Sequence, residues 1–172
     1  RQDAGLPTAV DRHRFGSGLY ENMLSEPIRQ LALREAITIP AELSVRDAVQ
    51  GMREKKLGCV IVVDEDNKPL GMFTEAMLRR LLIDNRTALD DSVQNHMARQ
   101  FPCAAIAEPV VTILEAMQAE NHRFVCVVDE KGQVAGLTGQ KGLMEYVADH
   151  FPQIVLTQRA GVEPPRGQRE GA

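Results

Sequence analysis

Three cysteines are the most reactive side chains in this chain, and their spacing does not indicate catalysis or a metal site. Cys59 and Cys126 lie in apolar runs typical of buried strands, and Cys103 stands apart from both. No two cysteines form a CxxC motif, and the four histidines show no spacing that would offer two ligands to one metal. The motifs of serine hydrolases, zinc proteases and P-loop proteins are also missing. We therefore expect no catalytic residue, no metal and no enzyme activity.

The elements that must position any site come in two copies. When the chain is shifted by 65 residues, segment 60–65 (VIVVDE) falls on segment 125–130 (VCVVDE), and Gly71 falls on Gly136. The offset needs no gap, and it is too long for the usual solenoid repeats. It predicts two supersecondary units related by a pseudo-twofold axis, with function in the cleft between them.

Each copy shows the same order of local patterns. In the first, Ser44 and Asp47 resemble a capping box that opens a helix with an apolar stripe. The continuous apolar run 59–63 predicts a strand buried on both faces. A turn and a short strand follow, and Thr74 can cap the next helix. A short extended piece precedes Ser44 and adds a first strand. Each copy is therefore predicted to have the order strand–helix–strand–strand–helix, which places the chain in the α/β (α+β) fold class.

Composition limits the class of partner. The chain has 172 residues, 44% of them hydrophobic, and a net charge of −4, which gives no attraction to nucleic acid or to an anionic membrane. No apolar run approaches the roughly 18 residues of a membrane-spanning helix. An odd number of cysteines argues against a disulfide framework and favours a reducing, cytoplasmic location. We expect a flexible arm at residues 1–19, a first repeat at 20–89, a second repeat at 90–152 and a flexible tail at 153–172.

With these patterns in view, the chain resembles a tandem pair of cystathionine-β-synthase (CBS) domains, often called a Bateman module. The resemblance rests on the Val-Val-Asp sequences at 62–64 and 127–129, which precede a turn and a Gly-h-h-Thr pattern, where h is apolar. It rests also on the two lead-in segments 26–31 and 91–97, and on the copy number of two. It covers roughly residues 20–151.

The resemblance implies a non-catalytic regulatory module that binds AMP, ADP, ATP or S-adenosylmethionine in clefts between the copies. In that family the pattern Gly-h-h-Thr/Ser-x-x-Asp supplies the ligand contacts. The carboxylate accepts charge-assisted hydrogen bonds from the two ribose hydroxyls. The hydroxyl and the backbone N–H groups at the helix start hold phosphate.

This chain departs from that pattern in both copies. The first copy keeps Thr74 but has Met77 where the ribose carboxylate belongs. The second has Gly139 and Gly142 at the two polar positions, and Thr138 is displaced by one residue, which in a strand puts it on the opposite face. Each lost charge-assisted hydrogen bond costs about 1.5–3 kcal/mol. We therefore expect weak nucleotide binding, with the first cleft less damaged than the second.

The candidate ligand contacts follow from the resemblance and from charge. Apolar or small residues would form the adenine walls and serve equally as core, and basic residues near the cleft could attract phosphate. The candidate set is Thr38, Ile39, Cys59, Val60, Thr74, Met77, Cys103, Ala104, Arg123, Phe124, Val125, Gly139 and Gly142. Further basic residues are Arg79 and Lys141, whereas Lys55 and Lys56 are better explained as cations at the C-terminus of the Ser44 helix.

Two functions stay open at this point. The first is a regulatory module that binds an adenosyl nucleotide weakly and signals to an unknown partner protein. The second is a degenerate CBS pair that serves as a dimerisation or interaction scaffold without a nucleotide. In both cases we expect a homodimer, because the helices carry more apolar surface than one small sheet can cover.

Overall fold

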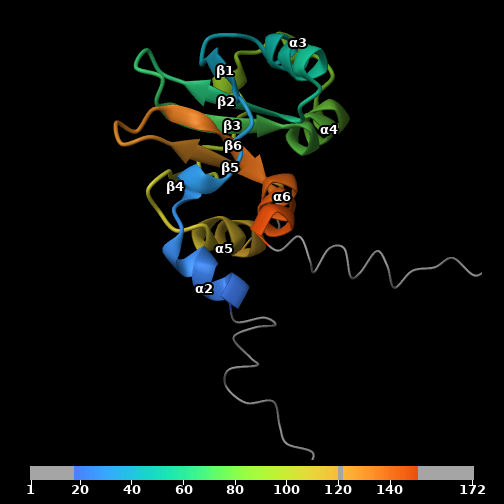
Figure 1. Cartoon of the computed structure of the whole chain (residues 1–172). Helices are drawn as coiled ribbons and strands as arrows, with labels where there is room; N and C mark the ends of the chain where they lie inside the picture. The colour runs from blue at the N-terminus through green and yellow to red at the C-terminus, as the bar shows by residue number, and fades with distance from the viewer. Residues whose placement is uncertain (1–17, 120–121, 151–172) are drawn as a thin grey trace, which may run out of the picture.

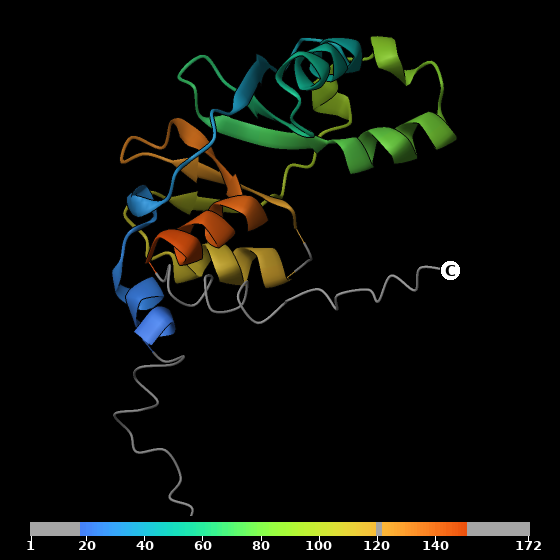
Figure 2. The same ribbon diagram turned by 45° about the vertical axis from the view of Figure 1, so that its right-hand side comes forward.

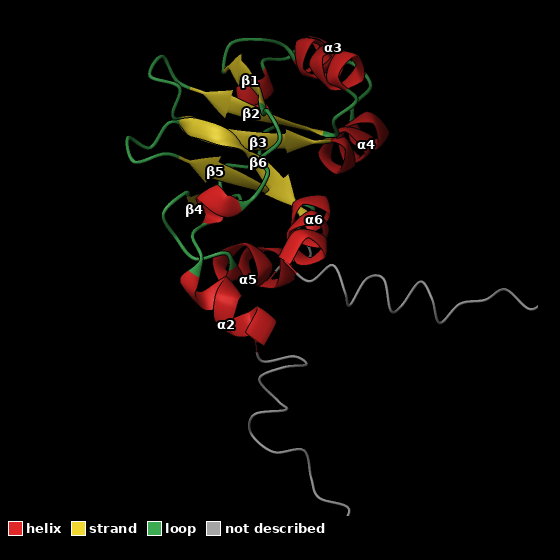
Figure 3. Ribbon diagram, in the orientation of Figure 1, coloured by secondary structure: helices red, strands yellow, loops and turns green. Residues whose placement is uncertain are grey.

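The computed structural model describes residues 18–119 and 122–150, which fold into two similar units (Figures 1 and 3). The first unit contains β1 (Ile37–Pro40), α3 (Val45–Lys55), β2 (Cys59–Val63), β3 (Pro69–Thr74) and α4 (Glu75–Asp84). The second contains β4 (Cys103–Ala105), α5 (Val111–Ala119), β5 (Phe124–Val128), β6 (Val134–Gly139) and α6 (Gln140–His150). Helix α2 (Gly18–Ser25) and the short 3₁₀ turns η2 (Ile28–Gln30), η3 (Ala88–Asp90) and η4 (Val93–Asn95) complete it. The order strand–helix–strand–strand–helix confirms the predicted α/β fold.

The two sheets have the same topology and the same register. In each, the middle strand pairs in parallel with the first strand and antiparallel with the third. Thr38 lies opposite Ile61 in the first sheet, and Cys103 lies opposite Cys126 in the second, both shifted by the sequence offset. The repeat in the sequence is therefore a repeat in hydrogen bonding.

The turn after each middle strand is built the same way in both units. Asp64 accepts hydrogen bonds from two backbone N–H groups of its turn, each at 2.9 Å, and Asp129 does the same at 2.9 and 3.0 Å. Each turn needs one left-handed residue, which is Asn67 (φ 60°) in the first unit and Gly132 (φ 78°) in the second. Asparagine and glycine tolerate this conformation best. Both turns predicted after the middle strands are present, and both are Asx turns.

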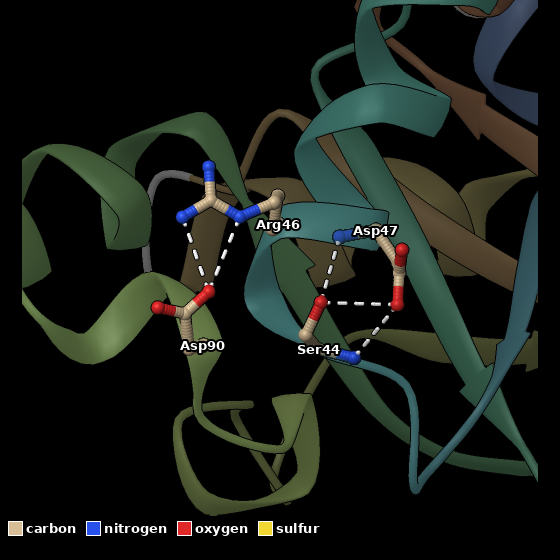
Figure 4. Close-up of polar contacts among 4 residues, drawn as sticks. All are labelled: Ser44, Arg46, Asp47 and Asp90. Atoms are coloured by element: carbon tan, nitrogen blue, oxygen red, sulfur yellow. Dashed lines mark hydrogen bonds and ion pairs between the residues drawn. The ribbon is translucent and has the colours of Figure 1, made fainter.

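Helix α3 begins with the predicted capping box (Figure 4). The Ser44 hydroxyl accepts a hydrogen bond from the Asp47 backbone at 3.1 Å, and the Asp47 carboxylate accepts one from the Ser44 backbone at 3.1 Å. The neighbouring Arg46 guanidinium contacts the Asp90 carboxylate of η3 at 3.1 Å. Both charged groups of that pair are exposed, so the ion pair contributes no more than about 1 kcal/mol.

The lead-in segments cross between the units. The Ile28 N–H donates to the Glu108 carbonyl at 2.8 Å, and the Val93 N–H donates to the Leu43 carbonyl at 2.7 Å. These two bonds are related by the offset of the repeat, so each unit gives the other the same contact. This reciprocal pattern is what a pseudo-twofold axis produces. Figure 2 shows the blue N-terminal segment running along the orange second unit before it enters the first.

The exchange extends to the hydrophobic cores. Ile28 is fully buried in the core of the second unit with Val125, whereas Val93 is fully buried in the core of the first with Val60. The predicted boundary near residue 90 divides the sequence into two repeats. In the folded protein, residues from both sides of this boundary pack into the same core. Neither unit therefore has a complete core without a segment that belongs to the other part of the sequence.

Strand β2 is buried on both faces, as its continuous apolar run predicts. Val60 and Val62 point into the core of the first unit. Cys59 and Ile61 point the other way, into a central core that contains residues of both units, among them Leu137 of the second. Because successive side chains of a strand alternate between faces, one apolar strand serves two cores.

The predicted arm and tail fall almost entirely outside the described residues, apart from Gly18 and Leu19, which begin α2. Within residues 18–119 and 122–150, no helix has the length and apolarity needed to cross a bilayer. The same residues contain no cluster of three acidic, histidine or cysteine side chains that could hold a metal ion.

Candidate ligand-binding site

A cavity of about 570 Å³ opens in the second unit, where β6 ends and α6 begins. This volume lies within the range of small-molecule sites, roughly 300–1,000 Å³. Its wall combines the first unit's lead-in, the residues around the start of β5, and the junction of β6 with α6. The lining residues are Ala32, Leu33, Arg34, Leu57, Arg123, Phe124, Leu137, Thr138, Gly139, Gln140, Lys141, Gly142 and Glu145.

Two glycines in the cavity wall allow a close approach of neighbouring atoms. A Cβ atom on Gly139 would lie 2.2 Å from the Arg123 carbonyl oxygen, which belongs to the backbone. A Cβ atom on Gly142 would lie 2.4 Å from the Thr138 hydroxyl oxygen. The space at both positions is therefore already taken by neighbouring atoms.

Thr138 is the unusual residue of this site. Its side chain is 6% exposed, and its hydroxyl oxygen has no hydrogen-bond partner among the described residues. A buried hydroxyl without a partner costs about 1–3 kcal/mol, so proteins seldom keep one. Because Thr138 lines the cavity, a polar group of a ligand could supply the missing hydrogen bond.

The charges around the cavity favour an anion. Three cationic residues line it, Arg34, Arg123 and Lys141, and one acidic residue, Glu145. Helix α6 also begins in the wall at Gln140, and a helix N-terminus carries unpaired N–H groups and a partial positive charge. The cavity can therefore accept a phosphate or another anionic group.

Arg34 is held in place by both units. Its backbone N–H and carbonyl pair with the backbone of Leu137 on β6, each at 2.8 Å. Its guanidinium donates to the backbone carbonyls of Lys55 and Lys56 at the end of α3, at 3.2 and 3.1 Å. Cations at a helix C-terminus are favoured by the helix dipole. The cavity wall is thus tied to the end of a helix in the first unit.

Four of the predicted site residues lie together in this cavity: Arg123, Phe124, Gly139 and Gly142. Thr138 lies on the opposite strand face from Gly139, as predicted, yet it contributes to the same cavity. Cys103 lines a different cavity of about 340 Å³, beside α5.

The other predicted residues serve mainly as structure. Thr74 caps α4, where its hydroxyl accepts a hydrogen bond from the Met77 backbone at 3.4 Å, and Met77 packs against the core of the first unit. Thr38 is exposed on β1. The remaining five are buried in cores: Ile39, Cys59, Val60, Ala104 and Val125.

The cavity of about 570 Å³ lies in the second unit, whereas the ligand-type residues of the sequence favoured the first. At the corresponding positions the first unit has larger side chains. Phe73 replaces Thr138 and is fully buried, and Met97 replaces Ala32. The Met97 sulfur lies 2.4 Å from where a Cβ of Gly71 would be, so Met97 packs over this glycine of β3.

Sequence reasoning missed eight of the lining residues: Ala32, Leu33, Arg34, Leu57, Leu137, Thr138, Gln140 and Glu145. Ala32 and Thr138 could have been found by comparing side-chain sizes between the two copies. Each is much smaller than its counterpart 65 residues away, which is Met97 for Ala32 and Phe73 for Thr138. Arg34 and Glu145 carry no such signal, because only the folded chain brings them to the cleft.

Comparison with known proteins now decides the family. The model of the CBS domain matches the chain twice, at residues 28–84 and 92–149. The chain belongs to the CBS domain family. Two matches in one chain make it a CBS pair, or Bateman module, and CBS pairs are generally regulatory rather than catalytic.

Solved CBS structures share this fold. The CBS domain protein PAE2072 from Pyrobaculum aerophilum, complexed with AMP, is 20% identical with a TM-score of 0.63, and the match covers 79% of this chain and 99% of that one. The CBS domain pair of protein MJ0100, complexed with 5′-methylthioadenosine and S-adenosyl-L-methionine, is 21% identical with a TM-score of 0.63. That match covers 72% of this chain and 97% of the other.

A longer relative contains a segment similar to this chain. The glycine betaine/carnitine/choline transport ATP-binding protein OpuCA of Bacillus subtilis is 27% identical over 127 residues. The match covers 72% of this chain and only 31% of OpuCA, so the chain spans about a third of that relative.

Proposed function

We propose that this CBS pair is a regulatory module that binds an adenosine nucleotide in the cleft of the second unit and signals its occupancy to a partner protein. AMP, ADP and ATP are the first ligands to test, because the cavity combines cationic side chains with a helix N-terminus. S-adenosylmethionine is the second, given that it and AMP are the ligands named for two structural neighbours. Binding is expected to be weak, because no carboxylate stands at position 142.

The observation that carries this proposal is Thr138, which lines the cavity and whose buried hydroxyl lacks a partner among the described residues. Selection for stability alone would replace this threonine with valine, which has almost the same shape and no polar atom. A ligand that hydrogen-bonds the hydroxyl gives a reason to keep it.

A thermal-shift and calorimetry screen of the whole chain tests the proposal directly. A ligand present at 100 times its Kd stabilises the folded state by about 2.7 kcal/mol, which raises the Tm by roughly 5–10 °C for a protein of this size. If AMP, ADP, ATP and S-adenosylmethionine all leave the Tm unchanged at millimolar concentration, nucleotide regulation is wrong and the scaffold function replaces it.

The substitution Thr138→Val gives the sharpest test of the site. We expect the ligand-free variant to be more stable than wild type by about 1 kcal/mol, because the unpaired hydroxyl is removed. We expect its affinity for the nucleotide to fall by a factor of roughly 2–10, the value of one hydrogen bond. Denaturant unfolding and calorimetry measure the two effects.

Thr74→Val is the matched control, because it makes the same isosteric change at the equivalent end of β3. Thr74 caps α4, so this variant should lose about 1 kcal/mol of stability while its affinity for the nucleotide stays unchanged. A Thr138→Val variant that is destabilised and binds normally would show that the hydroxyl has a structural partner and no ligand role.

We also infer that the protein is a homodimer that pairs through α4 and α6, which lie on the same side of the sheets in Figure 1. Large apolar side chains are exposed there: Ile83 is 83% exposed and Met144 67%. Light scattering at micromolar concentration is expected to give twice the chain mass, and Ile83→Glu combined with Met144→Glu to give the monomer. Tyr20→Glu, on α2, should leave the mass unchanged, and a monomeric wild type would rule out this interface.

A further inference from the structure

The second unit places two thiols side by side. Cys103 on β4 lies directly opposite Cys126 on β5 in a parallel pair. Neighbouring strands are about 4.8 Å apart, and residues in register point to the same face of the sheet. Disulfides join residues whose Cα atoms are about 4.4–6.8 Å apart, so the spacing of paired strands falls within the Cα range of a disulfide.

The two thiols also affect each other's pKa in the reduced protein. A hydrogen bond from the Cys126 thiol lowers the pKa of Cys103, although burial and the charge of Glu108 oppose this shift. The same hydrogen bond raises the pKa of Cys126, and burial adds to the effect. A thiolate therefore forms more readily on Cys103 than on Cys126. A thiolate is the reactive form of cysteine.

Exposure to solvent also distinguishes Cys103 from Cys126. Cys103 is exposed and lines the cavity of about 340 Å³ with Phe101 and Ala116, whereas Cys126 is fully buried. A small oxidant can reach Cys103 from solvent. Cys59, the third thiol, is buried, and its burial raises its pKa to about 12, so it stays a protonated core residue.

We propose that Cys103 and Cys126 form a redox modification site in which Cys103 reacts with a peroxide and Cys126 resolves the product as a disulfide. The Cys103 thiolate attacks one peroxide oxygen, the O–O bond breaks, and hydroxide leaves and takes up the proton released by Cys103. Cys126 then attacks the sulfenic acid sulfur, the S–S bond forms, and the S–O oxygen leaves as water. The two thiols lose two electrons, which reduce one hydrogen peroxide to two molecules of water. A small thiol reverses the modification by exchange.

The site belongs to the second unit alone. The equivalent pair in the first sheet is Thr38 opposite Ile61, which cannot be oxidised in this way. The disulfide would join the edge strand β4 to β5, whose first residue, Phe124, lines the ligand cavity. The proposal rests on the positions of the thiols and does not depend on nucleotide binding.

Peptide mapping of the whole folded chain tests the proposal. The protein is treated with hydrogen peroxide, the remaining thiols are alkylated in denaturant, and the chain is cut after lysine and arginine. We expect an intact mass lower by two hydrogens before alkylation, one free thiol of the original three, and a link between peptides 100–123 and 124–131. A small thiol added before alkylation should restore all three.

Three variants separate this chemistry from alternatives. Cys126→Ala should form no link and should leave a sulfenic acid on Cys103, which a carbon nucleophile such as dimedone traps. Cys103→Ala should form no link with hydrogen peroxide and should not be labelled by dimedone. Cys59→Ala should form the same link as wild type. Circular dichroism and a thermal melt check that each variant is folded. A link from peptide 57–79 to 124–131, a link between chains, or three free thiols after peroxide would each overturn the proposal.

Discussion

Replacing Gly139 with threonine, the residue that the family pattern would favour there, is expected to damage the protein rather than repair it. The new Cβ would lie 2.2 Å from the Arg123 carbonyl oxygen and 3.8 Å from the Phe124 Cα atom. These are backbone atoms at the start of β5, so they cannot rotate away as a side chain would. We expect a loss of about 1–3 kcal/mol in stability from overpacking. We also expect ligand affinity to fall by more than tenfold, because the shifted residues form the cavity wall.

The reverse exchange at the equivalent position is the control. Thr74→Gly removes the cap of α4 but leaves the second unit untouched, and glycine at a cap costs only a few tenths of a kcal/mol. Denaturant unfolding and nucleotide calorimetry on both variants give the comparison. A Gly139→Thr protein with wild-type stability and affinity would mean that the strand ends move freely, and that contact with Arg123 does not determine the residue at 139.

The largest loss of stability is expected from Phe73→Ala. Phe73 is the largest of the side chains that are almost fully buried, and it packs in the core of the first unit with Val60 and Val93. Removing a buried aromatic ring costs about 3–5 kcal/mol, from lost burial and from the space left behind. For a protein of this size the Tm should fall by on the order of 10 °C. Calorimetry or circular dichroism melting measures it.

Leu70→Ala tests whether this effect is specific to burial. Leu70 lies on the same strand but is 40% exposed, so its truncation should cost much less than that of Phe73. At a temperature where the Phe73→Ala protein is folded, its second cleft should bind ligand normally, because Phe73 does not line that cavity. Equal losses from the two variants would contradict the packing described for the first unit.

The sequence by itself determined the local structure of this protein. The apolar run 59–63, the Ser44–Asp47 capping box and the aspartates at 64 and 129 depend on residues within a few positions of one another, and each forms as predicted. The offset of the repeat also predicted the pseudo-twofold relation, because equal sequence patterns in equal order fold into equal units.

Only the tertiary structure shows that a cavity of about 570 Å³ forms in the second unit. Counting ligand-type residues favoured the first cleft, which keeps Thr74, but a cavity depends on the volumes of side chains from several segments. Thr138 and Ala32 are small where Phe73 and Met97 are large, and only the exchange of the lead-in segments brings Ala32 beside β6. A motif of four residues on one strand and helix carries no information about that distant segment.

The thiol pair also has one property that the sequence predicted and one that only the folded structure shows. The sequence marked Cys59 and Cys126 as buried strand residues, and both are. It could not pair Cys103 with Cys126, which lie on strands separated by helix α5, because the register between two parallel strands is set by the packing of the helix that connects them. Periodicity along a chain determines which side of an element faces the core, whereas contacts across the chain arise only when the elements pack together.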